Sequence, residues 1–183
     1  MTSAFEPQLP FAPAEPKAPA PPTVPFQVEV VRSAKRRKTI QARLEGGTLR
    51  VMIPARLTRA QERECVEEMT AKFARRLQSR EIDLDERARV LGRQLGLPQP
   101  SSIRWVDNQE HRWGSCTPAN GTIRISSRLS TYPGWVVDYV VVHELAHLVH
   151  ADHSPAFHAL VAQYPKAERA IGFLLAKGWE AED

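Results

Sequence analysis

The distribution of histidine constrains this chain more than any other feature of its sequence. Five of the six histidines lie between positions 143 and 158, and two of them enclose the segment His143-Glu144-Leu145-Ala146-His147. Residues four positions apart stack on one face of a helix. A helix here would bring both imidazoles to one metal ion and place Glu144 alongside it.

The segment that carries this motif, Gly134–His150, is ambiguous when it is judged by residue preferences alone. Its many valines favour a strand, whereas seventeen residues without an internal break favour a buried helix. The histidine spacing decides for the helix, because the motif needs both rings on one helical face. Zinc suits such a site, since it accepts imidazole nitrogens in tetrahedral coordination at about 2.0–2.1 Å.

A catalytic zinc site needs a third protein ligand and leaves its fourth position to water. His150 lies seven residues beyond His143, about 10.5 Å along a helix axis, so we do not expect both rings to reach one ion. His153 directly precedes Ser154-Pro155, which is typical of the N-cap and first residue of a helix and would fix its position. We therefore predict His153 as the third ligand, with His158 on that next helix, or no third histidine, as the alternatives.

The rest of the chain has the composition of one domain with a proline-rich tail. Residues 1–25 hold eight of the fifteen prolines and too little apolar surface to offset the entropy of ordering, so we expect a disordered tail. Residues 26–183 are long enough for one domain with a core, and too short for two of ordinary size. They contain patterns typical of both strands and helices, which predicts the α+β class.

Apolar periodicity and turn residues locate these elements. Strands are expected at 27–32, 38–44, 49–53, 103–107 and 122–126, and helices from Thr58, over 84–95, from Ser154 to about Gln163, and over 166–177. The first three strands are expected to form a small antiparallel unit. Thr58 and Gln61 have the spacing of a capping box, and Asn120-Gly121 predicts a hairpin turn.

The composition of the chain indicates its cellular compartment and the kinds of partner that it could bind. Two cysteines, Cys65 and Cys116, exclude a disulfide scaffold and favour a reducing cytoplasm. No stretch approaches 18 consecutive apolar residues, and the first residues lack a basic region followed by an apolar run, so we expect neither a membrane span nor a secretory signal. The basic cluster within Arg32–Lys38 is a candidate phosphate-binding surface. It contains no aromatic residue to stack on bases, so nucleic acid is not the favoured partner.

Three segments together resemble one known family. They are Arg112-Trp113-Gly114-Ser115-Cys116, the histidine motif followed by Leu148, and His153-Ser154-Pro155-Ala156-Phe157. In this combination, the chain resembles the YgjP-like metallopeptidases, relatives of the SprT-like proteases and other small zincins, over about residues 26–178. One departure is His158, at a position where the family commonly has an aromatic residue.

The resemblance implies an α+β, zincin-like domain in which small antiparallel sheet elements pack on the buried HExxH helix. It implies a zinc metallopeptidase, a hydrolase with a polypeptide substrate, in which zinc lies on His143, His147 and His153 and Glu144 is the catalytic base. In zincins generally, an edge strand before the metal helix binds substrate by strand addition. The resemblance assigns this role to Thr122–Ser126.

The residue types themselves support hydrolysis of an amide bond. Zinc lowers the pKa of a bound water toward ~7, and Glu144 would take its proton and later pass it to the leaving amine. A second donor to the oxyanion is expected, with Arg112, His158 and Tyr164 as candidates. Asp152 either orients a ligand imidazole or is a solvated turn residue, and Cys116 is not needed as a ligand.

Two other functions stay open at this level. In the first, the chain is a zinc-containing module that binds nucleic acid or protein without proteolysis. In the second, it is a hydrolase of non-peptide amides. A purely structural zinc site prefers four protein ligands and needs no base at Glu144, which argues against the binding module. Amide hydrolysis of either kind would use the same residues.

Overall fold

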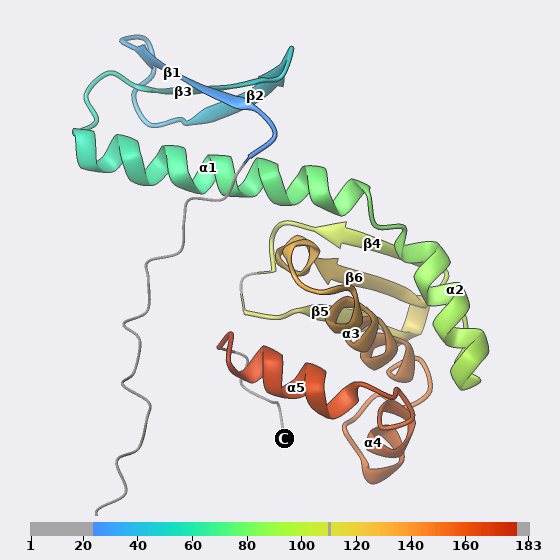
Figure 1. The fold of residues 1–183 in the computed structure, drawn as a ribbon. Helices are drawn as coiled ribbons and strands as arrows, with labels where there is room; N and C mark the ends of the chain where they lie inside the picture. Colours follow the sequence, from blue (N-terminus) through green and yellow to red (C-terminus); the bar gives the residue numbers. More distant parts are fainter. Residues whose placement is uncertain (1–23, 110, 179–183) are drawn as a thin grey trace, which may run out of the picture.

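The structure, a computed structural model, describes residues 24–109 and 111–178. All but the last two positions of the tail predicted for residues 1–25 lie outside these ranges. Within them, two groups of elements are joined by one long helix (Figure 1).

The N-terminal group is built on a three-stranded sheet. Strands β1 (Gln27–Ser33), β2 (Gln41–Glu45) and β3 (Thr48–Pro54) lie in the order β1-β3-β2. The turn between β2 and β3 uses Gly46 and Gly47, which both have positive φ, as a tight hairpin turn requires. β1 pairs with β3 in parallel, so the prediction of an antiparallel unit is wrong for this strand. Periodicity identifies the buried face of a strand, but it does not identify the neighbour with which the strand pairs.

Helix α1 (Arg59–Arg80) covers one face of this sheet (Figure 1). It begins at the predicted capping box: the Thr58 hydroxyl accepts a hydrogen bond from the backbone N–H of Gln61, and the Gln61 side chain accepts one from the backbone N–H of Thr58. The cluster beneath the helix is apolar and contains Leu49, Val51 and Ile53 of β3 and Val66, Met69, Phe73 and Leu77 of α1. The sheet and α1 therefore have a small hydrophobic core of their own.

The second group begins with helix α2 (Leu84–Leu95), which ends as predicted at Gly96 with a φ of 65°. A second three-stranded sheet follows, with strands β4 (Ser102–Val106), β5 (Gly114–Thr117) and β6 (Thr122–Ser126) in the order β4-β6-β5. β6 is parallel to β4 and antiparallel to β5. The hairpin predicted between β5 and β6 is confirmed, because a short 3-10 helix and a glycine form the turn there.

Helix α3 (Gly134–Ala146) is the centre of this second group and confirms the helix predicted from the histidine spacing. Nine of its thirteen residues are buried, since the second sheet, α2, α4 (Pro155–Val161) and α5 (Ala167–Leu175) surround it (Figure 1). Burial on all sides explains why a valine-rich segment is helical against its strand preference.

The two groups also touch beyond the covalent link. The Ser130 hydroxyl, in the 3-10 helix Ser127–Thr131, donates a hydrogen bond to the backbone carbonyl of Arg75 in α1 at 3.1 Å. None of the helices within the described ranges combines the length and apolar character needed to span a membrane.

Candidate active site

Three imidazoles converge where α3 ends. His143 lies in the last turn of α3, His147 is the C-cap residue, and His153 precedes the N-cap of α4. The Nε2 atom of His143 lies 3.2 Å from Nε2 of His147 and 3.3 Å from Nε2 of His153. Among the described residues, these three histidines are the only group of possible ligands found close enough together to hold a metal ion. The structure therefore brings together the three histidines that the sequence predicts as ligands.

The spacing of these nitrogens fits a tetrahedral metal ion. Ligand nitrogens about 2.0–2.1 Å from a tetrahedral zinc lie about 3.3–3.4 Å from one another. The two separations observed around His143 are within about 0.2 Å of that value. The residues present thus fit a divalent metal with three imidazole ligands.

The orientation of His147 is set by a backbone group. Its Nδ1 atom lies 3.1 Å from the carbonyl oxygen of His150. A carbonyl oxygen only accepts hydrogen bonds, so Nδ1 carries the proton and Nε2 offers its lone pair to the cluster. The acceptor that orients the His147 ring is therefore a backbone carbonyl, and the two roles considered for Asp152 stay predictions. This contact could not be predicted from the sequence, since a backbone carbonyl is present at every position.

Phe157 packs against all three rings. Its ring is stacked on His147 at a centroid distance of 4.5 Å and lies edge-on to His143 at 4.9 Å and to His153 at 4.8 Å. Phe157 is buried, and its backbone N–H donates to the side chain of the N-cap residue Ser154. The Ser154-Pro155 helix start, predicted from the sequence, thereby fixes both the phenylalanine and His153.

The environment keeps the central imidazole neutral. Burial, with smaller contributions from the neighbouring His147, His153 and His158, lowers the pKa of His143 to about 3. Neutral imidazole is the form that binds a metal ion, because a protonated ring has no free lone pair at Nε2. Burial of His143 therefore favours the metal-binding form.

Glu144 lies on the buried side of α3 and is 5% exposed. Its side chain packs directly over the backbone of Gly114 in β5. A Cβ atom at position 114 would lie 2.3 Å from the Glu144 Oε1 atom and 2.8 Å from Cδ and Cγ. Because Gly114 does not have a positive φ, the glycine is needed here for space rather than for backbone conformation. Gly114 belongs to the Arg112–Cys116 motif, but its spacing in the sequence does not reveal this contact with a residue of α3.

A cavity of about 600 Å³ lies beside the histidines and Glu144. One wall is β5, including Gly114 and Cys116. Another part of the lining comes from α4 and α5 and includes the apolar side chains of Val161, Ile171 and Leu174. The cavity therefore borders the edge strand β5, the histidine cluster and this apolar part of the lining, which we call the apolar recess.

The strand at this cavity is not the one that the sequence analysis assigned. Thr122–Ser126 forms β6, which lies in the middle of its sheet with β4 and β5 on either side. β5 is the edge strand, and it also contributes to the cavity wall. The assignment of Thr122–Ser126 as edge strand is wrong because the hairpin places the first of its two strands, not the second, on the outside.

Two of the three residues considered as donors to the oxyanion lie at the cavity. Arg112 and His158 line the cavity, whereas Tyr164 does not: its hydroxyl donates to the carbonyl of Trp135 at 3.1 Å. Tyr139, which the sequence analysis missed, lines the cavity near His143, and burial raises its pKa to about 12. Its hydroxyl is therefore protonated over the whole physiological range.

Cys116 lines the cavity without joining the cluster. Burial, with a smaller contribution from the charge of Glu144, raises the pKa of its thiol to about 11. Since the thiolate is the form that binds metal, this agrees with the expectation that Cys116 is not a ligand.

Three imidazoles around one point, beside a buried glutamate on the same helix, define a site of the metallopeptidase class. The chain belongs to the YgjP-like family: the family description "YgjP-like, metallopeptidase domain" matches residues 36–171. The predicted fold class, α+β and zincin-like, is thereby confirmed.

Two crystal structures resemble the chain in part. The metallopeptidase zymogen abylysin of Pyrococcus abyssi is 20% identical with a TM-score of 0.47, and the match covers 52% of this chain and 94% of that one. The metallopeptidase zymogen jannalysin of Methanocaldococcus jannaschii is 15% identical with a TM-score of 0.45, over 52% of this chain and 97% of that one. No curated protein sequence matches the chain.

Proposed function

We propose that this protein is a zinc-dependent metallopeptidase that hydrolyses peptide bonds with Glu144 as general base. The observation that carries the proposal is the convergence of three Nε2 atoms beside this buried carboxylate. A structural zinc site would need a fourth protein ligand, and none accompanies the three histidines in the described part of the chain. The alternative of a zinc-containing binding module is therefore less well supported.

The proposed metal is zinc, held by His143, His147 and His153. Imidazole nitrogens in tetrahedral geometry suit zinc, and three ligands leave one position open. When bound, zinc lowers the pKa of a water molecule to near neutrality and polarises the carbonyl of the substrate. The proton chemistry then belongs to residues of the chain.

Glu144 is proposed to accept the proton of the attacking water and to deliver it to the leaving amine. Its position next to His143 on α3, with its side chain on Gly114, holds the carboxylate at the cavity beside the cluster. A base within hydrogen-bond reach of the attacking water is what general base catalysis needs. Arg112 and His158 line the same cavity and are the proposed donors to the oxyanion.

The substrate is proposed to bind as an extended polypeptide along β5. A sheet edge pairs with an extended chain through backbone hydrogen bonds, and β5 is the edge that borders the cavity. The apolar recess formed by α4 and α5 would then receive a side chain next to the cleaved bond. Hydrolysis of a non-peptide amide would not use the strand edge.

We also propose that residues 26–183 act as one unit in a reducing, cytoplasmic compartment. The contact between Ser130 and Arg75 supports a single unit. Both cysteines are free thiols, which supports the compartment. Nucleic acid remains a partner that we do not favour.

Removal of the metal tests the proposal directly. Unfolded casein and a quenched fluorescent peptide library are expected to be cleaved by the purified protein, and 1,10-phenanthroline is expected to abolish cleavage. Addition of zinc, but not of magnesium, is expected to restore it, because magnesium prefers oxygen ligands. Cleavage that persists after the metal has been removed would exclude a zinc mechanism.

A second test uses the contact between β5 and the proposed base. Gly114→Ala places a methyl group where the Glu144 carboxylate lies, and is expected to lower kcat about tenfold to a hundredfold, because a small displacement of a catalytic group is costly. Zinc content is expected to stay unchanged. The control is Gly172→Ala in α5, where an added Cβ meets nothing within 4 Å. Equal activity of both variants would show that Glu144 does not need this position.

A further inference from the structure

A second hollow lies far along the chain from the histidines, between β1 and the first turns of α1. Its volume is about 820 Å³, and we call it the β1–α1 groove. Its lining residues come from three places, the end of β1, the β3–α1 connection and α1, and are Val30, Arg32, Leu57, Thr58, Arg59, Glu62, Arg63 and Val66.

The strand along this groove has a free edge. In the described part of the chain, β1 pairs with β3 on one side and with no strand on the other. The strand register places Val28 and Val30 opposite Leu49 and Val51, which are fully buried on the face beneath α1. Val28 and Val30 are nevertheless 39% and 37% exposed. The apolar face of the sheet thus continues past the helix that covers it, to an unpaired edge.

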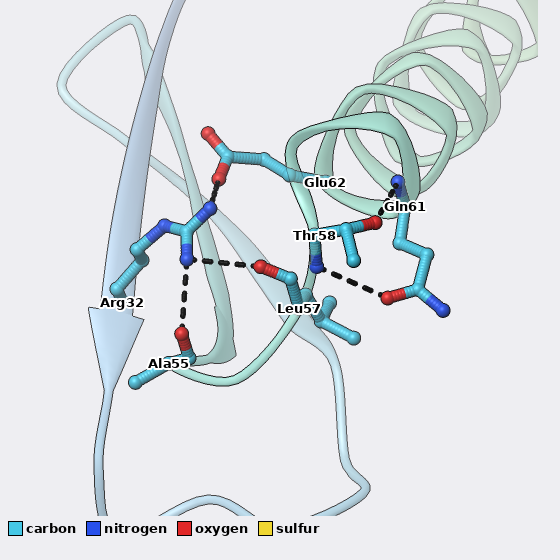
Figure 2. Close-up of polar contacts among 6 residues, drawn as sticks. All are labelled: Arg32, Ala55, Leu57, Thr58, Gln61 and Glu62. Carbon is cyan, nitrogen blue, oxygen red and sulfur yellow. Dashed lines mark hydrogen bonds and ion pairs between the residues drawn. The ribbon is translucent and has the colours of Figure 1, made fainter.

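Contacts of Arg32 hold one end of the groove together. The Arg32 guanidinium donates to the backbone carbonyls of Ala55 and Leu57 at 2.9 and 3.0 Å and forms an ion pair with Glu62 (Figure 2). Figure 2 also shows the capping box of Thr58 beside these contacts. The end of β1 is therefore connected to both the β3–α1 segment and the first turn of α1 by contacts of one side chain.

The opposite wall is a stripe of α1 with both apolar and basic side chains. Arg59, Arg63 and Val66 lie at positions i, i+4 and i+7, which share one face of a helix. Arg59 and Arg63 are exposed and have no ion pair within the described ranges, whereas Glu62 is already paired with Arg32. The groove therefore offers the aliphatic side chains of Val30, Leu57 and Val66, together with two arginines that no carboxylate pairs with in the described ranges.

We infer that the β1–α1 groove is a docking site for an extended acidic segment of a partner protein, which adds a strand to the free edge of β1. Strand addition gives affinity through the backbone and specificity through alternate side chains. Aliphatic side chains of the segment would cover Val28 and Val30, and acidic side chains farther along the same face would meet Arg59 and Arg63. The site lies apart from the cavity at the histidines, so the inference does not depend on the peptidase activity.

Two other occupants fit the groove less well. A second copy of the chain would bring its own Arg59 and Arg63 toward this basic surface, and like charges repel. Nucleic acid would find no aromatic side chain among the lining residues on which to stack a base, and it cannot use the backbone edge of β1. An extended acidic peptide can pair with the arginines, cover the aliphatic side chains and form backbone hydrogen bonds with the edge of β1.

The probe for a binding test follows from the alternation of a strand. The fluorescein-labelled peptide Thr-Val-Thr-Val-Thr-Glu-Thr-Glu places two valines and then two glutamates on one face. Its fluorescence anisotropy is measured with the full chain at low ionic strength, because salt screens exposed charges. Mass spectrometry verifies that the peptide stays intact. Saturable binding is expected, and a peptide with lysine in place of both glutamates is expected to bind at least tenfold more weakly.

Substitutions test whether the groove is the place of binding. Arg59→Glu with Arg63→Glu is expected to weaken binding of the acidic peptide at least tenfold and to strengthen binding of the lysine peptide. The matched control is Lys72→Glu with Arg76→Glu. It changes the net charge by the same amount, at two exposed positions of α1 that are also four residues apart but lie outside the groove. It is expected to leave binding within about twofold. Val30→Thr is expected to weaken binding about threefold, since it removes apolar contact without disturbing the strand.

Hydrogen exchange distinguishes strand addition from loose charge attraction. Amides of β1 are expected to become protected when the peptide binds, while those of β2, at the far edge, are expected to stay unchanged. Absence of saturable binding, equal losses in both double variants, or no protection of β1 would overturn the inference. Dimerisation of the chain that is lost with Val30→Thr, or tighter binding of oligo-dT that is lost with Arg59→Glu and Arg63→Glu, would assign the groove to one of the other occupants. None of these outcomes concerns peptide cleavage, so failure here is distinct from failure of the proposed activity.

Discussion

Glu144→Gln is expected to lower the rate of peptide hydrolysis by about 10²–10⁴-fold, the range typical of the loss of a general base. Glutamine has nearly the same shape, so it fits the space over Gly114 in which the carboxylate packs. Its amide cannot take a proton from water at neutral pH. The three histidines are unchanged, so we expect the variant to keep about one zinc ion per chain. Elemental mass spectrometry of the purified protein measures this zinc content.

The matched control for this variant is Glu168→Gln. Glu168 also lines the cavity, but it lies on α5, is exposed, and is not a member of the histidine cluster. Its loss is expected to leave kcat within about threefold, because an exposed charge contributes little. If Glu144→Gln retained the full rate, another group would be the base. If it lost zinc as well as activity, the effect would be one of folding or metal binding rather than of proton transfer.

The features that sequence predicted correctly depend on local relations. The spacing of His143 and His147 chose a helix for a segment whose valines favour a strand, and α3 is that helix. The Ser154-Pro155 helix start located His153 beside the other two histidines. Capping, turns and helical spacing all act within a few residues, so a single sequence displays them.

The features that escaped prediction depend on contacts between distant segments. β1 pairs in parallel with β3, which has β2 on its other side, and β5 rather than β6 is the outer strand of its sheet. The packing of Glu144 on Gly114 joins residues thirty positions apart. Strand order and such close approaches follow from how segments assemble, and periodicity within each segment does not record them.

His153→Ala is expected to weaken zinc binding at least about a hundredfold. Removal of a residue that hydrogen-bonds to a metal ligand typically lowers the affinity for the metal 10–100-fold. Removal of the ligand itself is expected to lower this affinity more. The variant keeps the capped start of α4, because Ser154 and Pro155 are unchanged. Zinc affinity is measured by competition with a chromophoric chelator, and circular dichroism verifies that the fold is intact. Hydrolysis is expected to fall with zinc occupancy.

Two neighbouring histidines make this experiment specific. His158 stacks on His153 at a centroid distance of 6.2 Å but contributes no nitrogen to the cluster, so His158→Ala is expected to retain zinc. His150→Ala is also expected to retain it, because the group that orients His147 is the carbonyl of residue 150, which the substitution preserves. If His158→Ala lost zinc while His153→Ala kept it, the third ligand would be His158. If all three variants kept zinc, the metal would be held elsewhere, and the open three-histidine site on which the proposed mechanism depends would be excluded.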